Sequence, residues 1–234
     1  MNQKRLIVNA DDFGQSTGIN KGIIHAHENG IVTSASLMVR YPAVTEAVTY
    51  SKSHKNLGVG LHLDLGEWYY SNGQWKVLYA VVNMEDIEAV RNEINRQLDT
   101  FRQLTGKNPT HIDSHQHVHL RDNILPVAKD VARQLNITLR RQSDKVNYVG
   151  DFYGQAEDGS HYLQAISVDA LQIVISRIIE GITEIACHPG FADDMQTMYK
   201  NERQIEVQTL CDQRIIEAVI KSGIELGTFE NISF

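Results

Sequence analysis

The sequence has little cysteine, no excess of basic charge and no long apolar run. Its 234 residues include only Cys187 and Cys211, too few for a disulfide framework, so we expect stability from burial in a reducing compartment. The 22 Lys and Arg against 29 Asp and Glu give a net charge of −7, which argues against general nucleic-acid or anionic-membrane binding. The N-terminal residues read as neither a signal peptide nor a membrane span, and no later run approaches about 18 apolar residues. We therefore expect a cytoplasmic protein.

Short apolar and β-branched runs alternate with longer stretches of helical period. The spacing of apolar residues by three or four is clearest from Ile87 to Leu104. This alternation predicts an α/β fold of parallel strands, closed as a barrel or left open as a doubly wound sheet, with the active site at the strands' C-terminal ends. We expect strands at residues 6–10, 34–39, 57–63, from about 111, 138–140, 183–187 and 225–228, and helices at 19–29, 43–53, about 87–104, 125–135, 168–179 and 201–221.

Two long stretches, residues 66–83 and 142–165, lack clear periodicity, and we expect both to be covering or binding loops. The first is rich in aromatic residues, among them Trp68 and Trp75. The sequence has no repeat of fixed period, no low-complexity tract and no linker, so we expect residues 1–234 to form a single domain.

Two adjacent carboxylates, Asp11 and Asp12, stand at the end of the first expected strand. One could bind a divalent cation while the other acts as general base on the cation's water. Taken alone, the run NADDFG at residues 9–14 fits a turn with a helix-capping Asp better.

His62 closes the strand expected at 57–63, and Asp64 follows two residues later, on the same face. Gly58 and Gly60 leave room for the close approach of another backbone or a ligand. In isolation, His62 is more simply a histidine held by hydrogen bonds at a strand end.

Four of the ten histidines fall within nine residues, around Asp113. As a strand running into a loop, a period of two puts all of them and Asp113 on one side; as a helix, His115 and His119 share a face. Either arrangement converges imidazoles, and Asp113 can orient one of them. This favours a metal or catalytic site over a surface histidine run or adventitious metal capture. The four histidines are His111, His115, His117 and His119.

Cys187 and His188 end the strand expected at 183–187. A thiol nucleophile with His188 as its base is one interpretation, but neighbouring residues on a strand point to opposite faces. We expect Cys187 to be a buried small apolar residue and His188 to face the site.

Four of seven expected strands thus end in acids or histidines, which packing does not require. One Asp and two His leave coordination positions open for water and substrate, as in a catalytic metal centre.

These motifs resemble the YdjC-like carbohydrate deacetylases, the group of the chitooligosaccharide deacetylases. The resemblance implies an irregular (β/α) barrel of about seven parallel strands, like that of the polysaccharide deacetylases, with a divalent metal that is usually magnesium. It implies Asp12, His62 and His115 as metal ligands, Asp11 as base and His188 as a second catalytic group. The donor types alone favour zinc or another late first-row ion. The matching runs are NADDFG (9–14), GIVTSASLM (30–38), GVGLHL (58–63), PTHIDSHQHVH (109–119) and CHPG (187–190).

The resemblance implies hydrolysis of an N-acetyl group from an amino sugar or chitooligosaccharide. Asp11 would take a proton from metal-activated water, the hydroxide would attack the acetyl carbonyl, and a protonated His188 would donate to the leaving amine. The aromatic residues of 66–83 could stack on sugar rings or equally form the small core of a loop. A homo-oligomer is compatible with the sequence.

Two other functions suit the same residues. A metal-dependent phosphoesterase also uses a His/Asp-rich barrel mouth, with two or three metals, and a non-catalytic sugar-binding protein could use the pocket without turnover. Metal stoichiometry and acetate release distinguish these three. Asp64 and the short connection over 66–83 depart from the family pattern, and the sequence assigns no definite function to Asp64, Asp113, His111, His117 or His119.

Overall fold

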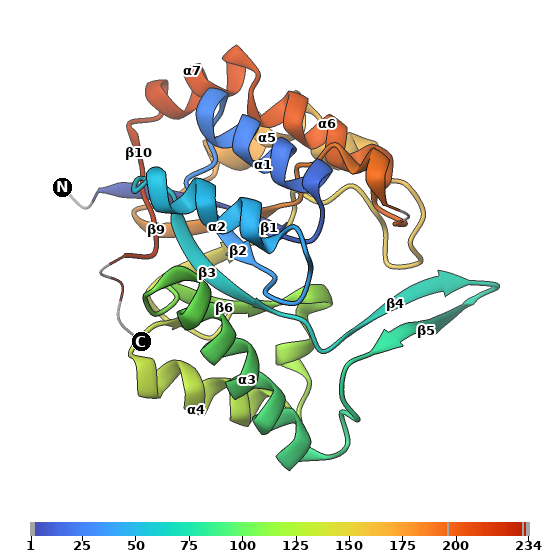
Figure 1. Cartoon of the computed structure of the whole chain (residues 1–234). Helices are drawn as coiled ribbons and strands as arrows, with labels where there is room; N and C mark the ends of the chain where they lie inside the picture. The colour runs from blue at the N-terminus through green and yellow to red at the C-terminus, as the bar shows by residue number, and fades with distance from the viewer. Residues whose placement is uncertain (1–2, 196, 231, 233–234) are drawn as a thin grey trace.

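The computed structural model describes residues 3–195, 197–230 and 232, and its core is one sheet of parallel strands (Figure 1). Seven strands follow the order β7-β6-β3-β2-β1-β9-β8, and β10 pairs with the start of β1. Within the described residues no pairing joins β7 to β8, so the sheet is an open half-barrel and the predicted parallel α/β fold is confirmed. The strands of this sheet are β1 (Lys4–Phe13), β2 (Ser34–Leu37), β3 (Gly58–Leu63), β6 (His111–Ser114), β7 (Thr138–Leu139), β8 (Val146–Val149), β9 (Gly181–Cys187) and β10 (Ile224–Leu226).

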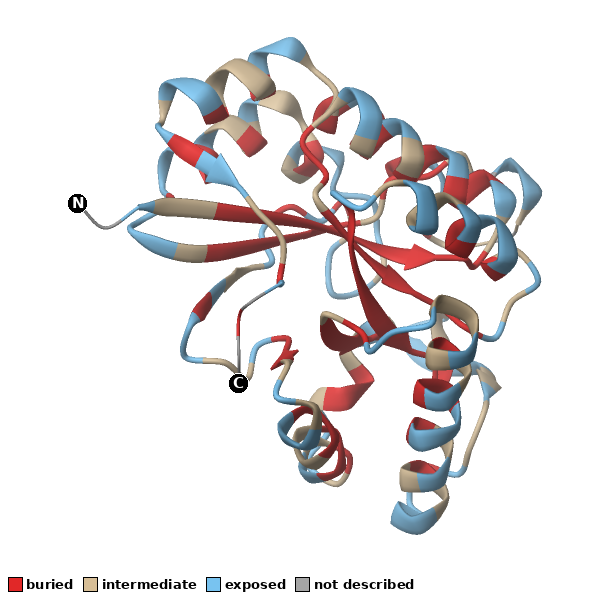
Figure 2. Cartoon of the chain, turned by 60° about the vertical axis from the view of Figure 1, so that its left-hand side comes forward, coloured by how far each residue is buried: buried red, intermediate tan, exposed pale blue. Residues whose placement is uncertain are grey.

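Helices pack around the outside of the sheet and bury it. Figure 2 shows the central strands buried and the outward faces of the helices exposed. The helices are α1 (Thr17–Asn29), α2 (Val44–Ser53), α3 (Ile87–Thr105), α4 (Leu125–Leu135), α5 (Val168–Ser176), α6 (Lys200–Leu210) and α7 (Gln213–Lys221), with 3-10 turns η1 (His115–Leu120), η2 (Leu163–Ile166) and η3 (Ala192–Asp194).

Local signals in the sequence fix several of these elements. Ser16 caps α1 by accepting a hydrogen bond from the amide of Ile19, and Asp86 caps α3 in the same way. Gly106 ends α3 with a left-handed φ of 79°, which glycine adopts without strain. The apolar stripe of α3 is buried, as its spacing predicts.

The prediction of a loop over residues 66–83 was wrong. An antiparallel hairpin, β4 (Gly66–Ser71) and β5 (Gln74–Ala80), occupies most of it. Asn72 and Gly73 both have positive φ, 53° and 77°, which is the turn that an Asn-Gly pair favours between two strands. The Asn72-Gly73 pair is a hairpin signal, but the prediction was based on the aromatic residues around it and missed this turn.

Two further boundaries differ from the prediction. The stretch 142–165 is not entirely loop, because β8 lies in it and pairs in parallel with β9. The helix predicted over 201–221 is two helices, α6 and α7, separated at Cys211 and Asp212. The side chain of Asp212 accepts a hydrogen bond from the amide of Arg214 and so starts α7.

In the part of the chain that the structure describes, no helix combines the length and apolar character needed to cross a membrane. Cys187 and Cys211 are both free thiols.

Candidate functional site

A cavity of about 670 Å³ opens at the carboxyl ends of the strands. All five predicted site residues line it: Asp11, Asp12, His62, His115 and His188. They come from β1, β3, the start of η1 and the residue after β9, so the parallel sheet brings together positions far apart in the sequence.

A β-bulge explains how the neighbouring Asp11 and Asp12 both serve one site. The register of β1 against β2 shifts between Ala10 and Phe13, and Asp12 has a φ of 68°. A bulge re-aims side chains that would otherwise alternate between faces. Both carboxylates are buried. Ser16, not either Asp, caps the following helix.

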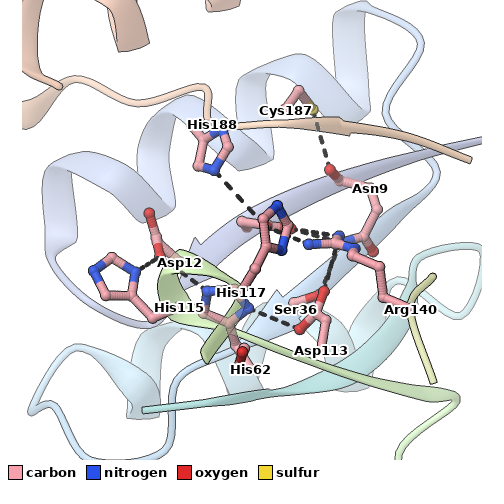
Figure 3. Close-up of polar contacts among 12 residues, drawn as sticks. Asn9, Asp12, Ser36, His62, Asp113, His115, His117, Arg140, Cys187 and His188 are labelled. Atoms are coloured by element: carbon pink, nitrogen blue, oxygen red, sulfur yellow. Dashed lines mark hydrogen bonds and ion pairs between the residues drawn. The ribbon is translucent and has the colours of Figure 1, made fainter. Parts of the chain in front are cut away.

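Asp12 is the centre of a three-residue cluster (Figure 3). Its Oδ1 lies 3.0 Å from Nδ1 of His115 and 3.2 Å from Nε2 of His62. One ligand atom from each of the three residues lies within 4.8 Å of the others. Nε2 of His115 is buried and makes no hydrogen bond within the described residues, and it lies 3.8 Å from Glu67 Oε2. One carboxylate and two imidazoles at this spacing fit a divalent cation.

The charges in this cluster are strongly coupled. Burial raises the pKa of Asp12, but Arg203 and His115 outweigh it and hold that pKa well below its usual range. Burial lowers the pKa of His62 and His115, yet the facing carboxylates raise them to about 10 and about 9. Both shifts favour the protonated imidazoles, and a cation held by these residues would have to displace those protons.

Arg140 holds Asp11 in place. Its two terminal nitrogens donate to Asp11 at 2.6 and 2.8 Å, and Asn9 Nδ2 donates to Oδ1 at 2.9 Å. Burial raises the pKa of Asp11, but the guanidinium more than offsets this and lowers it. Asp11 is thus an ionised carboxylate in a fixed orientation.

Asp113 orients the imidazole of His62 through its Nδ1 atom. Its Oδ1 lies 2.7 Å from Nδ1 of His62, which leaves Nε2 facing Asp12. Its Oδ2 accepts a hydrogen bond from Ser36 Oγ at 2.6 Å and forms an ion pair with Arg140 at 2.8 Å. This is the acceptor position that the sequence suggested for Asp113.

His188 lies close to the carboxylate of Asp11. Its Nε2 lies 3.7 Å from Asp11 Oδ2, and its backbone N–H donates to Glu206. Burial lowers the pKa of His188 to about 4, so its imidazole is neutral at rest. Cys187 is fully buried, and burial raises the pKa of its thiol, which excludes it as the nucleophile.

The period-two interpretation of the histidine cluster was wrong beyond Ser114. There β6 ends, and Gln116 and His117 take left-handed φ values of 49° and 53°. Before that point the period of two holds, since His111 and Asp113 both contact Ser36 Oγ, and His111 also stacks on Phe229 at 3.9 Å between ring centroids. His119 is held by Ser114 Oγ at 2.6 Å, whereas His117 lines the cavity.

Asp64 does not join the cluster. It forms an ion pair with Arg40 and accepts a hydrogen bond from Tyr79 Oη at 2.9 Å, at the foot of the β4–β5 hairpin.

Four buried charged residues at the site were missed from the sequence. Arg140 follows β7, so the rule that parallel strands end at the site would have found it. Glu184 points from β9 to Arg140 Nε, at 2.7 Å. Arg203 and Glu206 lie on α6, where no sequence signal separates buried from exposed charges.

The chain matches known proteins over most of its length. The model of the YdjC-like protein family matches residues 5–221. The chain belongs to the YdjC-like family. It is 33% identical to the "Carbohydrate deacetylase" of Geobacillus stearothermophilus, with 95% of this chain and 96% of that protein covered. It is 34% identical to the "Chitooligosaccharide deacetylase" of Klebsiella pneumoniae (strain 342), covering 98% of this chain and 100% of that one.

Solved structures show that this YdjC-like chain shares its fold with other enzymes. A crystal structure from Enterococcus faecalis V583, of a protein named for cellobiose-phosphate cleavage, matches with a TM-score of 0.82 at 30% identity over 99% of this chain and 100% of that one. A family 4 carbohydrate esterase from Streptomyces lividans matches with a TM-score of 0.58 at 14% identity, over 97% and 93% of the two chains. The second likeness concerns the fold alone.

Proposed function

We propose that this chain is a metal-dependent hydrolase that removes N-acetyl groups from amino sugars or chitooligosaccharides. The observation that carries the proposal is the Asp12, His62 and His115 cluster beside Asp11 and His188 at one cavity. The names of the full-length relatives support the substrate class. We also propose that residues 1–234 act as one domain in the cytoplasm, in keeping with the two free thiols.

Asp12, His62 and His115 would hold the cation. A divalent ion bound there lowers the pKa of water and polarises a carbonyl oxygen. Magnesium is expected from the family, whereas two imidazoles and one carboxylate suit zinc or another late first-row ion.

The chain's own residues would move the protons. Asp11, kept ionised by Arg140, accepts a proton from the attacking water. His188, neutral at rest and 3.7 Å from Asp11, takes that proton from Asp11 and donates it to the departing amine. The amine needs this proton because it is otherwise a poor leaving group.

Arg140 favours this function over a phosphoesterase with two metals. A second group of possible ligands, Asp11, His62 and Asp113, lies beside the first. The Arg140 guanidinium already donates to Asp11 at 2.6 Å and forms an ion pair with Asp113 at 2.8 Å. A second cation would have to displace a buried guanidinium, so we expect one metal per chain.

Acetate release tests the proposal. N-acetylglucosamine and its β-1,4-linked di- and trisaccharides would be incubated with protein loaded with Mg²⁺, Zn²⁺ or other first-row ions. We expect Asp11→Asn to lose at least about 100-fold in kcat while keeping its metal. Asp193→Asn, at an exposed position, is the control.

Three results would contradict it. Full activity of Asp11→Asn would remove Asp11 as the base. Two or more metals per chain would favour a phosphoesterase. Sugar binding without acetate release in any metal would indicate a binding protein.

A further inference from the structure

The β4–β5 hairpin forms a two-stranded sheet of its own and extends away from the main sheet (Figure 1). Three of its residues, Glu67, Trp68 and Trp75, line the cavity that holds Asp12, His62 and His115. The hairpin is therefore a wall of the site as well as a projection from the fold.

One face of the hairpin is apolar. Trp68 lies opposite Val77, and Tyr70 lies opposite Trp75. Directly opposed residues of an antiparallel pair share a face, as do alternate residues along each strand. We call these four residues the inner face, because both tryptophans line the cavity.

Trp75 and Val77 are the exposed residues of the inner face. The Arg121 guanidinium lies over the Trp68 ring at 4.4 Å, so Trp68 already has a partner. Trp75 meets Tyr70 edge-on at 5.5 Å yet remains 51% exposed, and Val77 is 57% exposed. Burying an exposed tryptophan against a ligand is favourable, because this removes apolar surface from water.

Gln116 fixes the position of the inner face relative to His115 and the other two residues of its cluster. Its Oε1 accepts from the Trp68 amide at 2.9 Å, and its Nε2 donates to the Trp68 carbonyl at 2.8 Å. Gln116 directly follows His115. At the foot of the hairpin, the Tyr79 hydroxyl donates to buried Asp64 at 2.9 Å.

We propose that the inner face is a carbohydrate subsite that binds a second sugar ring while the N-acetyl group of the first lies at Asp11 and Asp12. The occupant is an oligosaccharide, because the apolar C–H face of a pyranose ring matches a flat aromatic ring. Trp75 lines the same cavity of about 670 Å³ as Asp12, His62 and His115, which supports this occupant. The proposal rests on the proposed function and adds a preference for substrates of two or more rings.

Trp75→Ala and Leu78→Ala make a matched pair of variants. Leu78 is on the same strand and 55% exposed, but it does not line the cavity. For both variants and Trp75→Phe, calorimetry would give the Kd for tri-N-acetylchitotriose, and acetate release would give kcat/KM for the mono- and trisaccharide. Light scattering would give the molar mass.

We expect Trp75→Ala to raise the trisaccharide Kd and lower its kcat/KM about tenfold, with the monosaccharide rate unchanged. Leu78→Ala should match the wild type, and Trp75→Phe should recover most of the loss.

Four outcomes separate the two proposals. Equal losses for both sugar lengths, or no loss, would overturn the subsite while leaving the deacetylase intact. A change in molar mass in Trp75→Ala would assign the face to a second copy of the chain and also overturn it. Trisaccharide binding that depends on Trp75 without acetate release would keep the subsite and reject the deacetylase. No sugar binding and no acetate release would reject both.

Discussion

Arg203 donates to Oδ2 of Asp12 at 2.6 Å, while Oδ1 of the same carboxylate lies against His62 and His115. The guanidinium comes from α6 and is buried. It therefore sets which oxygen of Asp12 faces the two imidazoles. A buried residue that orients a ligand in this way usually affects how tightly a metal is held.

We expect Arg203→Gln to weaken metal binding by about 10- to 100-fold, because Asp12 loses the donor that fixes its orientation. Titration against a competing chelator would measure this. Lys200→Gln, on the same helix but paired with exposed Asp193, should bind metal normally. Tighter binding in Arg203→Gln would show instead that the guanidinium acts mainly by repelling the cation.

Arg140→Met should destabilise the fold by about 3–5 kcal/mol, because it leaves the buried carboxylates of Asp11, Asp113 and Glu184 without their common partner. Urea unfolding at neutral pH would measure the loss. Arg141→Met is the matched control, since Arg141 is exposed and contacts the ring of Tyr148. A loss as small as that of the control would mean that the three carboxylates are satisfied without Arg140.

We expect the buried carboxyl of Glu206 to lower the free energy of unfolding as the pH rises. Burial raises its pKa to about 8, above the usual 4.5, so the folded state binds its proton more tightly than the unfolded state. This contribution is complete below about pH 4.5 and is lost as the pH rises toward 8. Its slope reaches at most about 1.4 kcal/mol per pH unit. Unfolding free energies across this range should fall less steeply in Glu206→Gln, and identical slopes in both proteins would refute the assignment.

Gln116→Ala should lower kcat/KM for the trisaccharide more than for the monosaccharide, because the hairpin loses two hydrogen bonds that fix Trp68 beside His115. The expected effect is a higher KM with little change in kcat. Gln134→Ala, on helix α4 outside the cavity, is a control of the same residue type. A loss in kcat alone would show that Gln116 acts through His115 instead of through the hairpin.

Local patterns predicted much of the fold. The apolar stripe of α3 and the short apolar runs predicted parallel strands alternating with helices. The errors fell where two signals competed. In 66–83 the aromatic residues masked the Asn-Gly turn, and at Asp212 an unbroken helical period concealed a new cap.

The sequence by itself determined the positions of Asp11, Asp12, His62 and His188, because a parallel α/β order puts the ends of its strands at one edge of the sheet. Only the tertiary structure decided their partners. Arg140 is 129 residues from Asp11, and Arg203 is 191 residues from Asp12. Such pairs leave no periodic signal, because which charge becomes buried depends on how helix and strand pack and not on spacing along the chain. The bulge at Asp12 and the Gln116 contact with Trp68 are of the same kind, and they set the geometry on which the proposed chemistry depends.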